Sequence, residues 1–236
     1  MNDDIILIGS IDIAKLNFCF YIEEINLKEF SKITNIPKLA RYNADGTPTK
    51  EFIEILEQIY KNGKRILLKN VDITDGTDDK GKYFDSKWCH NMFDVLDEYE
   101  DLWQNVSIVV VERQMAFGKK VNTMAIKLGQ NCQSYFMLNY GRDIKVIEFD
   151  AYHKTVVLGA KKDISKTKTG KIKYVNIGDR ARKKWTVEEA FGILNLREDF
   201  ETMSEIGLDK KRDDKCDTIC QLQAFKYLYF VDKMEL

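Results

Sequence analysis

Two strand-like segments at the start of the chain constrain the fold most, because almost nothing separates them. Residues 5–13 (IILIGSIDI) and 17–25 (NFCFYIEEI) are rich in the β-branched and aromatic residues that favour strands. The AKL stretch between them leaves no room for the helix that usually joins two parallel strands. We therefore expect two neighbouring antiparallel strands, with Asp12 in the middle of the first apolar segment.

Hydrophobic spacing and turn residues divide the rest of the chain into further elements. Apolar residues at helical spacing predict the helices, and Ser86 is expected to cap one of them. The expected helices are 49–62, 86–103, 119–139, 185–195 and 210–231, and the expected later strands are 65–72, 107–112 and 144–149. The Lys- and Gly-rich residues 160–182 are expected to be mobile when nothing is bound. This order indicates an α/β layered fold.

Cysteine content and hydropathy favour an intracellular protein that does not enter a membrane. The five cysteines are scattered and form no CxxC pair, so a disulfide framework is not expected. No apolar run approaches the roughly 18–20 residues that span a bilayer. The acidic N-terminus also lacks the basic start of a secretory signal.

The net charge of −1 conceals a strong asymmetry along the chain. Residues 161–184 have a local net charge of +8, and residues 72–101 have one of −7. A basic segment of this density is typical of a surface that contacts phosphates. Its cations are Lys161, Lys162, Lys166, Lys168, Lys171, Lys173, Arg180, Arg182, Lys183 and Lys184.

Four carboxylates stand out from the expected elements. Asp12 lies within an apolar strand, and Glu112 ends another, VVVER. Asp214 and Asp217 are spaced so that they share one face of a helix. Burying carboxylates is costly unless a cation pairs with them, and oxygen ligands alone suit Mg²⁺ or Mn²⁺. The alternative for the helical pair is that both residues are solvated in the first turn, where acids favour the helix dipole.

These segments resemble the RuvC-like branch of the RNase H-like superfamily, and most closely the poxvirus-type Holliday junction resolvases. The resemblance is carried by SIDIAKLNFCFYI (10–22), VVVERQ (109–114) and KKRDDKCDTIC (210–220), and more weakly by RKKWTVEEAF (182–191). It implies one nuclease domain over residues 1–236, built on a mixed five-stranded sheet whose first three strands are antiparallel. Helices flank the sheet, and residues 27–63 and the basic arm 160–184 are additions to it.

The resemblance also implies a role for each residue. Asp12 would bridge two Mg²⁺ or Mn²⁺ ions per active site, Glu112 and Asp217 would complete their coordination, and Asp214 would lie beside them. Lys184 would stabilise charge on the phosphate, with Lys183 as the nearby substitute. Either lysine could instead simply follow the DNA backbone with the rest of the basic arm.

The implied partners are branched DNA and a second copy of the chain. A four-way junction has near two-fold symmetry, which suits a homodimer that makes paired symmetric nicks. Such an enzyme would serve viral DNA recombination or concatemer resolution, in the host cytoplasm if the protein is poxvirus-like. Helix 119–139 could supply a dimer surface, although core packing is favoured. The insertion 27–63 could add DNA contacts or dimer surface, or do neither.

Three alternatives remain open from the sequence. The first is another RuvC-like nuclease, such as a flap or branched-DNA endonuclease or a DEDD-type transposase. The second is an actin-like or sugar-kinase-like ATPase, which needs glycine-rich phosphate loops that this chain lacks. The third is a non-catalytic DNA-binding relative, which would be expected to have lost at least one of the four carboxylates.

Overall fold

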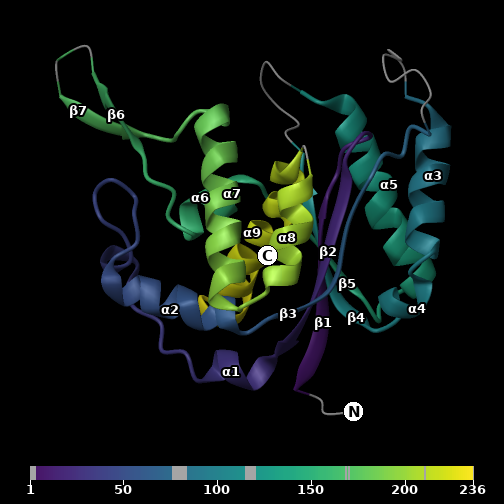
Figure 1. The fold of residues 1–236 in the computed structure, drawn as a ribbon, viewed down its shortest axis with the longest axis horizontal. Coiled ribbons are helices and arrows are strands. Elements are labelled where there is room, and N and C mark those ends of the chain that lie inside the picture. Colours follow the sequence, from purple (N-terminus) through teal and green to yellow (C-terminus); the bar gives the residue numbers. More distant parts are fainter. Residues whose placement is uncertain are drawn as a thin grey trace. The chain divides into compact units, whose positions relative to one another are not determined.

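The computed structural model describes residues 4–75, 84–114, 121–167, 169, 171–209 and 211–235. They form two compact units. The first unit holds the described residues of 1–27 and 63–151, and the second holds those of 28–62 and 152–235. The insertion therefore belongs with the C-terminal part of the chain (Figure 1). That both units act as one nuclease domain stays a prediction.

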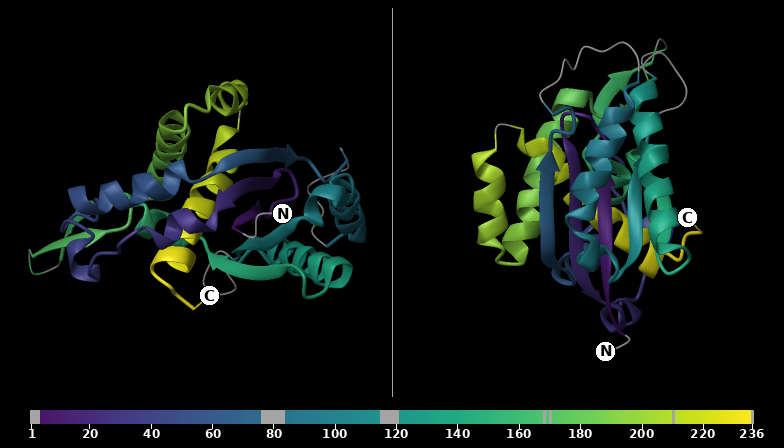
Figure 2. Two further views of the ribbon diagram at one scale, coloured as in Figure 1. Left: turned by 90° about the horizontal axis from the view of Figure 1, so that it is seen from below. Right: turned by 90° about the vertical axis from the view of Figure 1, so that its right-hand side faces the viewer.

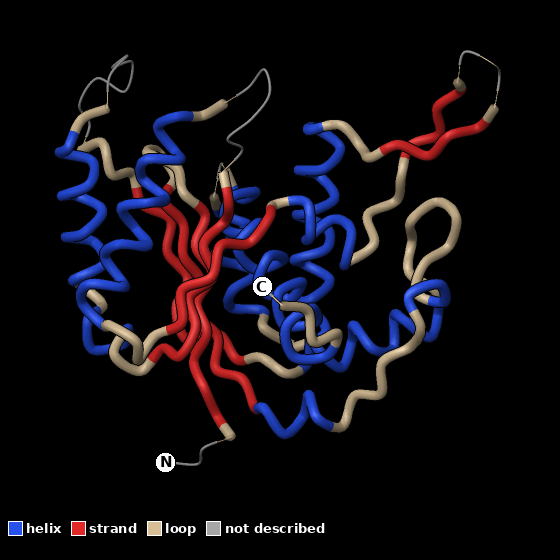
Figure 3. The backbone as a smooth tube through the Cα atoms, turned by 180° about the vertical axis from the view of Figure 1, so that it is seen from behind, coloured by secondary structure: helices blue, strands red, loops and turns tan. Residues whose placement is uncertain are grey.

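A mixed five-stranded sheet is the centre of the first unit (Figure 3). The strands are β1 (Ile5–Asp12), β2 (Phe18–Asn26), β3 (Lys64–Val71), β4 (Val106–Arg113) and β5 (Lys145–Asp150). Their order is β3-β2-β1-β4-β5, in which β1, β2 and β3 are antiparallel and β1, β4 and β5 are parallel. This is the topology of the RNase H-like fold, so the predicted fold class is confirmed.

Helices α3 (Ser86–Asp97), α4 (Glu100–Trp103) and α5 (Thr123–Tyr140) pack on one face of this sheet (Figures 1 and 2). Alternate strand residues such as Ile11 and Val111 point into this core, where they meet the fully buried Trp103 and Phe136. Because Leu128, Cys132, Tyr135 and Phe136 of α5 belong to it, the favoured core packing of that helix is confirmed.

Two details of the predicted helix 86–103 were wrong. The structure divides it into α3 and α4, because Tyr99, with φ −117° and ψ 23°, leaves the helical conformation between them. The N-cap of α3 is Asp85 rather than Ser86, since the Asp85 side chain accepts a hydrogen bond from the backbone N–H of Lys87 at 2.9 Å.

The second unit is mainly helical. Its elements are α1 (Leu27–Ser31, begun in the first unit), the 3₁₀ turn η1 (Lys38–Ala40), α2 (Lys50–Lys61), α6 (Tyr152–Val157), β6 (Asp163–Lys166), β7 (Ile172–Val175), α7 (Asp179–Leu196), α8 (Phe200–Leu208), α9 (Arg212–Lys226) and the π-helical turn η2 (Tyr227–Val231). None of the described helices is both long enough and apolar enough to cross a membrane.

The basic arm contains regular structure that the sequence analysis did not predict. Its described residues form an antiparallel β6–β7 hairpin, in which Ile164 pairs with Tyr174 and Lys166 with Ile172, and α7 begins at Asp179 rather than at residue 185. The expectation that residues 160–182 are mobile when nothing is bound stays a prediction. Cross-strand pairs stabilise such a hairpin although its composition is rich in Lys.

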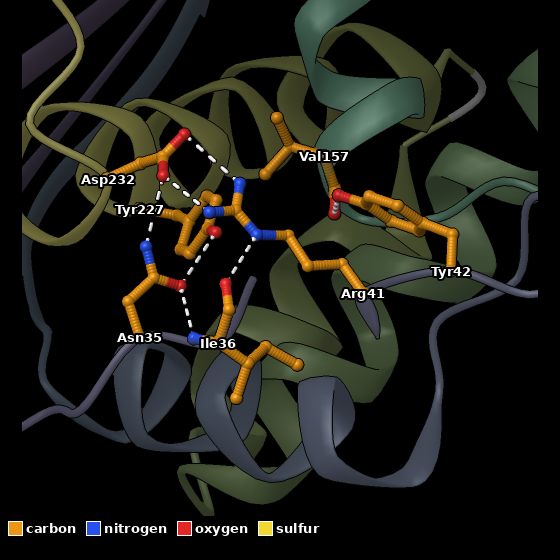
Figure 4. A network of polar contacts seen from close by, with 7 residues as sticks. All are labelled: Asn35, Ile36, Arg41, Tyr42, Val157, Tyr227 and Asp232. Carbon is orange, nitrogen blue, oxygen red and sulfur yellow. Dashed lines mark hydrogen bonds and ion pairs between the residues drawn. The ribbon is translucent and has the colours of Figure 1, made fainter. Parts of the chain in front are cut away.

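The insertion is fastened to the C-terminal end of the second unit by a buried ion pair (Figure 4). The Arg41 guanidinium donates to both carboxylate oxygens of Asp232, at 2.6 and 3.1 Å, and its Nε donates to the carbonyl of Ile36 at 3.1 Å. Asn35 also donates to Asp232 at 3.0 Å and accepts from the Tyr227 hydroxyl at 3.1 Å. These contacts pack the insertion within its own unit, and the DNA contacts and dimer surface considered for it stay predictions.

We predict that Arg41→Ala lowers the free energy of unfolding by about 3–5 kcal/mol, because Asp232 would keep a buried charge without its partner. Urea unfolding measures this. Arg182→Ala, which removes the solvent-exposed partner of Asp179, is the matched control and should cost less than about 1 kcal/mol. Equal losses in the two variants, or additive losses in Arg41→Ala/Asp232→Ala, would contradict a buried coupled pair.

A second prediction concerns pH. Glu189 on α7 accepts a 2.8 Å hydrogen bond from the hydroxyl of Tyr60 on α2, and Cys220 of α9 also faces it. Burial raises the pKa of Glu189, an effect that the Tyr60 hydrogen bond partly offsets. The stability that a carboxyl group with a raised pKa contributes is present below its unfolded pKa of about 4.3 and is lost as pH rises through the folded pKa.

Glu189→Gln should therefore become progressively more stable relative to the wild type as the pH rises above about 4.3. Urea unfolding at a series of pH values measures the difference. Glu188→Gln, on the exposed side of the same helix, should follow the wild-type profile. A Glu189→Gln profile parallel to that of the wild type would show that the buried carboxyl group does not control this dependence.

Candidate functional site

Asp12 and Glu112 end two adjacent parallel strands of the first unit. The parallel register pairs Ser10 with Val110 and Ile11 with Val111, so the next residues along the two strands are Asp12 and Glu112. Neighbouring strands lie about 4.8 Å apart, and residues paired in this way project from the same face. The two carboxylates therefore lie side by side on the face opposite the α3–α5 core.

The other acidic residues at this end of the sheet project from the opposite face. Glu148 and Asp150 of β5 pair in register with Val111 and Arg113. Both form ion pairs with the exposed Arg113 side chain, at 3.3 and 3.0 Å. Asp12 and Glu112 therefore differ from Glu148 and Asp150 in the face of the sheet from which they project.

A third polar residue shares the face of Asp12, two strands away. The antiparallel registers pair Asp12 with Cys19 and Cys19 with Asn70, so all three project from one side of the sheet. The amide oxygen of Asn70 is buried and has no hydrogen-bond partner among the described residues. The sequence analysis did not single out Asn70, because one Asn in a strand has no characteristic spacing.

The remaining carboxylates lie on α9 of the second unit, where two lysines from other helices meet them. The ammonium group of Lys154, on α6, lies 2.8 Å from an Asp217 oxygen, and the Lys154 side chain is only 4% exposed. Lys183, on α7, forms an ion pair with Asp213. The acidic helix is therefore held by paired charges from two neighbouring helices rather than being simply solvated.

Charge and burial affect these carboxylates differently. Burial raises the pKa of Asp214, and the nearby charge of Asp213 raises it further. Burial would also raise the pKa of Asp213, but the hydrogen bond and positive charge of Lys183 bring it below its usual value. The same hydrogen bond raises the pKa of Lys183. At neutral pH, Asp213 and Lys183 therefore form a stable ion pair beside Asp214.

The structure separates the two lysines that the sequence proposed for phosphate contact. Lys184 is 80% exposed and lies 3.5 Å from Glu188 on its own helix. Lys183 is the one that contacts the acidic helix. The sequence analysis included neither Lys154 nor Asp213, although Asp213 is one helical turn from Asp217.

The other predicted DNA-contacting residues lie on or near the hairpin and the start of α7. Lys161 and Arg182 make exposed ion pairs with Asp45 and Asp179, at 3.9 and 3.4 Å. Most of the remaining side chains are exposed and Lys162 is half-buried; this group comprises Lys162, Lys166, Lys171, Lys173 and Arg180. Lys168 lies outside the described residues.

The predicted metal ligands divide between the units, with Asp12 and Glu112 in the first and Asp214 and Asp217 in the second. Within either unit, the described residues contain no group of three or more His, Cys, Asp and Glu side chains that could hold a metal ion. The chemistry of the donors still fits Mg²⁺ or Mn²⁺, because each half offers carboxylate oxygens. All five cysteines are buried.

Comparison with solved structures finds RuvC of Thermus thermophilus, 11% identical, with a TM-score of 0.48 and coverage of 95% of this chain and 98% of RuvC. The same protein in complex with a Holliday junction substrate gives 11% identity, a TM-score of 0.47 and coverage of 94% and 96%. The yeast mitochondrial Holliday junction resolvase Ydc2 gives 12% identity, a TM-score of 0.46 and coverage of 96% and 85%. Activity and substrate are not carried over at this level of similarity.

Sequence comparison gives a stronger result. No family model matches the chain. The Uncharacterized protein 170L of Invertebrate iridescent virus 6 is 35% identical over 243 residues, which cover 98% of this chain and 93% of the viral protein. A viral relative was expected, although this one comes from an iridescent virus and not from a poxvirus. The chain belongs to the same family as the 170L protein of Invertebrate iridescent virus 6.

Proposed function

We propose that the protein is a metal-dependent DNA endonuclease that resolves four-way junctions by paired symmetric nicks. The observation that carries this proposal is the β1–β4 register, which sets Asp12 and Glu112 side by side on one face. The resemblance of these strand ends and of α9 to resolvase motifs supplies the reaction class. The virus relative fits a role in viral DNA recombination or concatemer resolution, and the host cytoplasm is the proposed location.

The proposed metal ligands are the four carboxylates that the sequence resemblance implies. Asp12, Glu112, Asp214 and Asp217 would hold two Mg²⁺ or Mn²⁺ ions. When bound, these ions would supply an activated water and stabilise the leaving 3′-oxygen in an in-line displacement. The chain's own part is to hold its carboxylates oriented. Because the 3′-oxygen is the leaving group, the products would carry 5′-phosphate and 3′-hydroxyl ends.

The lysines would orient this constellation. Lys154 fixes one oxygen of Asp217, which leaves the second oxygen for coordination. Lys183 neutralises Asp213 and so limits the repulsion between the carboxylates of α9. Because Lys183 lies next to these carboxylates, it is better placed than Lys184 to stabilise charge on a phosphate. The contacts of Lys154 and Lys183 both depend on how helices α6 and α7 pack against α9.

The basic arm and a second copy of the chain complete the proposal. The arm would contact phosphates, which gives affinity for shape rather than sequence. A homodimer would present identical sites to the two symmetric strands of a junction. Sedimentation equilibrium is expected to give twice the mass of one chain, and a monomer on DNA would contradict the paired nicks.

We predict that Asp12→Asn lowers cleavage of a labelled mobile four-way junction by more than about 100-fold while binding persists. Loss of groups that merely support a metal ligand costs roughly 10–100-fold, and loss of a ligand should cost more. Cleavage is measured in Mg²⁺ and in Mn²⁺. The matched control is Asp150→Asn, which changes a strand-end carboxylate on the opposite face and should keep most of the activity.

The products distinguish the alternatives. Symmetric nicks that a ligase can reseal support junction resolution. Equal cutting of flaps or single strands would replace it with a broader nuclease activity. If folded wild-type protein binds junctions but cuts nothing in either metal, the catalytic assignment is wrong and a DNA-binding protein remains.

The two adjacent lysines provide a further prediction. Lys183→Ala should lower the cleavage rate at saturating DNA by about tenfold or more, because Asp213 loses its partner beside the other carboxylates. Lys184→Ala should instead weaken DNA binding a few-fold and reduce the salt dependence by about one ion. Single-turnover cleavage and anisotropy titrations separate the two effects. The opposite pattern would restore Lys184 to the role that the sequence resemblance gave it.

A further inference from the structure

The β6–β7 hairpin carries an apolar face that is largely exposed. Ile164 pairs with Tyr174, and Ile172 pairs with Lys166, so these four side chains project from one side. Ile164 is 69% exposed, Ile172 66% and Tyr174 39%. Figures 1 and 3 show the hairpin extending beyond the end of α7, within the second unit.

Such a face is unusual in a free hairpin. A sheet with one polar side normally buries its other side in a core. Three large apolar side chains that stay in contact with water forgo the stabilisation that burial would give. The opposite side carries Asp163, Ser165, Lys173 and Val175 and is mainly polar. Contiguous exposed apolar residues mark a surface that another molecule covers.

The surrounding charges identify the kind of molecule. Lys166 shares the apolar face, Lys173 occupies the other face of β7, and Lys171 precedes that strand. Asp163 is the one acidic side chain in the two strands. A partner that is both apolar and strongly anionic fits this surface, and nucleic acid with accessible bases has that combination.

A continuous duplex does not offer such a surface, because its bases are stacked and only groove edges are open. The branch point of a junction interrupts stacking and presents base faces beside phosphates. Apolar side chains that enter a base step are typical of proteins that bind distorted DNA, and lysines on the same element then contact the flanking phosphates.

We propose that the face formed by Ile164, Ile172 and Tyr174 packs against unstacked bases at the branch point of a DNA junction, while the lysines of the hairpin hold the adjoining phosphates. This inference rests on the proposed function in that it needs branched DNA as the ligand. It does not need cleavage. The face sets the preference for branched over linear DNA, and the lysines set overall affinity.

The test compares two variants of the apolar face with one of the charged face. Ile164→Thr/Ile172→Thr and Tyr174→Thr keep strand-forming residues and remove apolar or aromatic surface. Lys173→Gln is the matched control on the opposite side of β7. Each protein is titrated, in EDTA to prevent cutting, against a four-way junction and a linear duplex. The junction carries 2-aminopurine at the branch point, which fluoresces more strongly when it is unstacked.

The wild type is expected to raise 2-aminopurine fluorescence on binding. Both apolar-face variants should lose most of this rise and bind the junction at least about fivefold more weakly, the lower end of the cost of losing one base stack. Their duplex affinity should stay within about twofold, since phosphate contacts dominate it. Lys173→Gln should keep the fluorescence rise and weaken both DNAs equally, with a salt dependence reduced by about one ion.

Several outcomes would overturn the inference. Equal weakening of junction and duplex by the apolar-face variants would make the face a general contact. An unchanged fluorescence signal together with a changed sedimentation mass would assign the face to a second copy of the chain. If the wild type cuts junctions without any fluorescence rise, this inference fails and the proposed function stands. If the wild type binds junctions with the fluorescence rise but never cuts them, the proposed function fails and this inference stands.

Discussion

The register between β1 and β4 is the constraint on which the candidate site depends. Strand residues alternate between faces, so a slip by one position would turn Asp12 or Glu112 toward the α3–α5 core. The fully buried Ile11 and Val111 oppose that slip, because it would exchange their apolar contacts for a buried carboxylate. The same two positions that hold the core together therefore fix the separation and direction of the acids.

Paired charges fulfil the corresponding role in the second unit. Helix α9 is buried over most of its length, including the Lys215 and Lys226 side chains. Lys215 lies 2.8 Å from Glu205 and 2.9 Å from Asp209, and Lys226 donates to the carbonyl of Asn62 at 2.9 Å. The two ion pairs of Lys215 add little net stability, but breaking one is costly. They fix the rotation of α9, and with it the direction of its acids.

The sequence predicted what short-range periodicity encodes. The individual strands and helix α2 follow from spacing within one segment, whereas the mixed five-stranded sheet was implied by the family resemblance. Contacts between distant segments have no such signal. Lys154 meets Asp217, and Lys183 meets Asp213 across 30 positions of sequence. Their significance depends on how α6, α7 and α9 pack. The hairpin was missed for another reason. Its many lysines, including Lys166 on the same side as Ile164, Ile172 and Tyr174, hide the apolar alternation that predicts a strand.

The structural role of the insertion could not be predicted either, because its contacts are with residues far away in the sequence. Its helix α2 was predicted, but nothing in residues 28–62 indicates what the helix supports. Its buried Tyr60 hydroxyl donates to Glu189 of α7, and Arg41 is bound to Asp232, 191 positions away. Because α7 also carries Lys183, an insertion that fixes α7 helps to fix the cation beside the acids of α9. Residues far from the carboxylates can thus influence their geometry through packing alone.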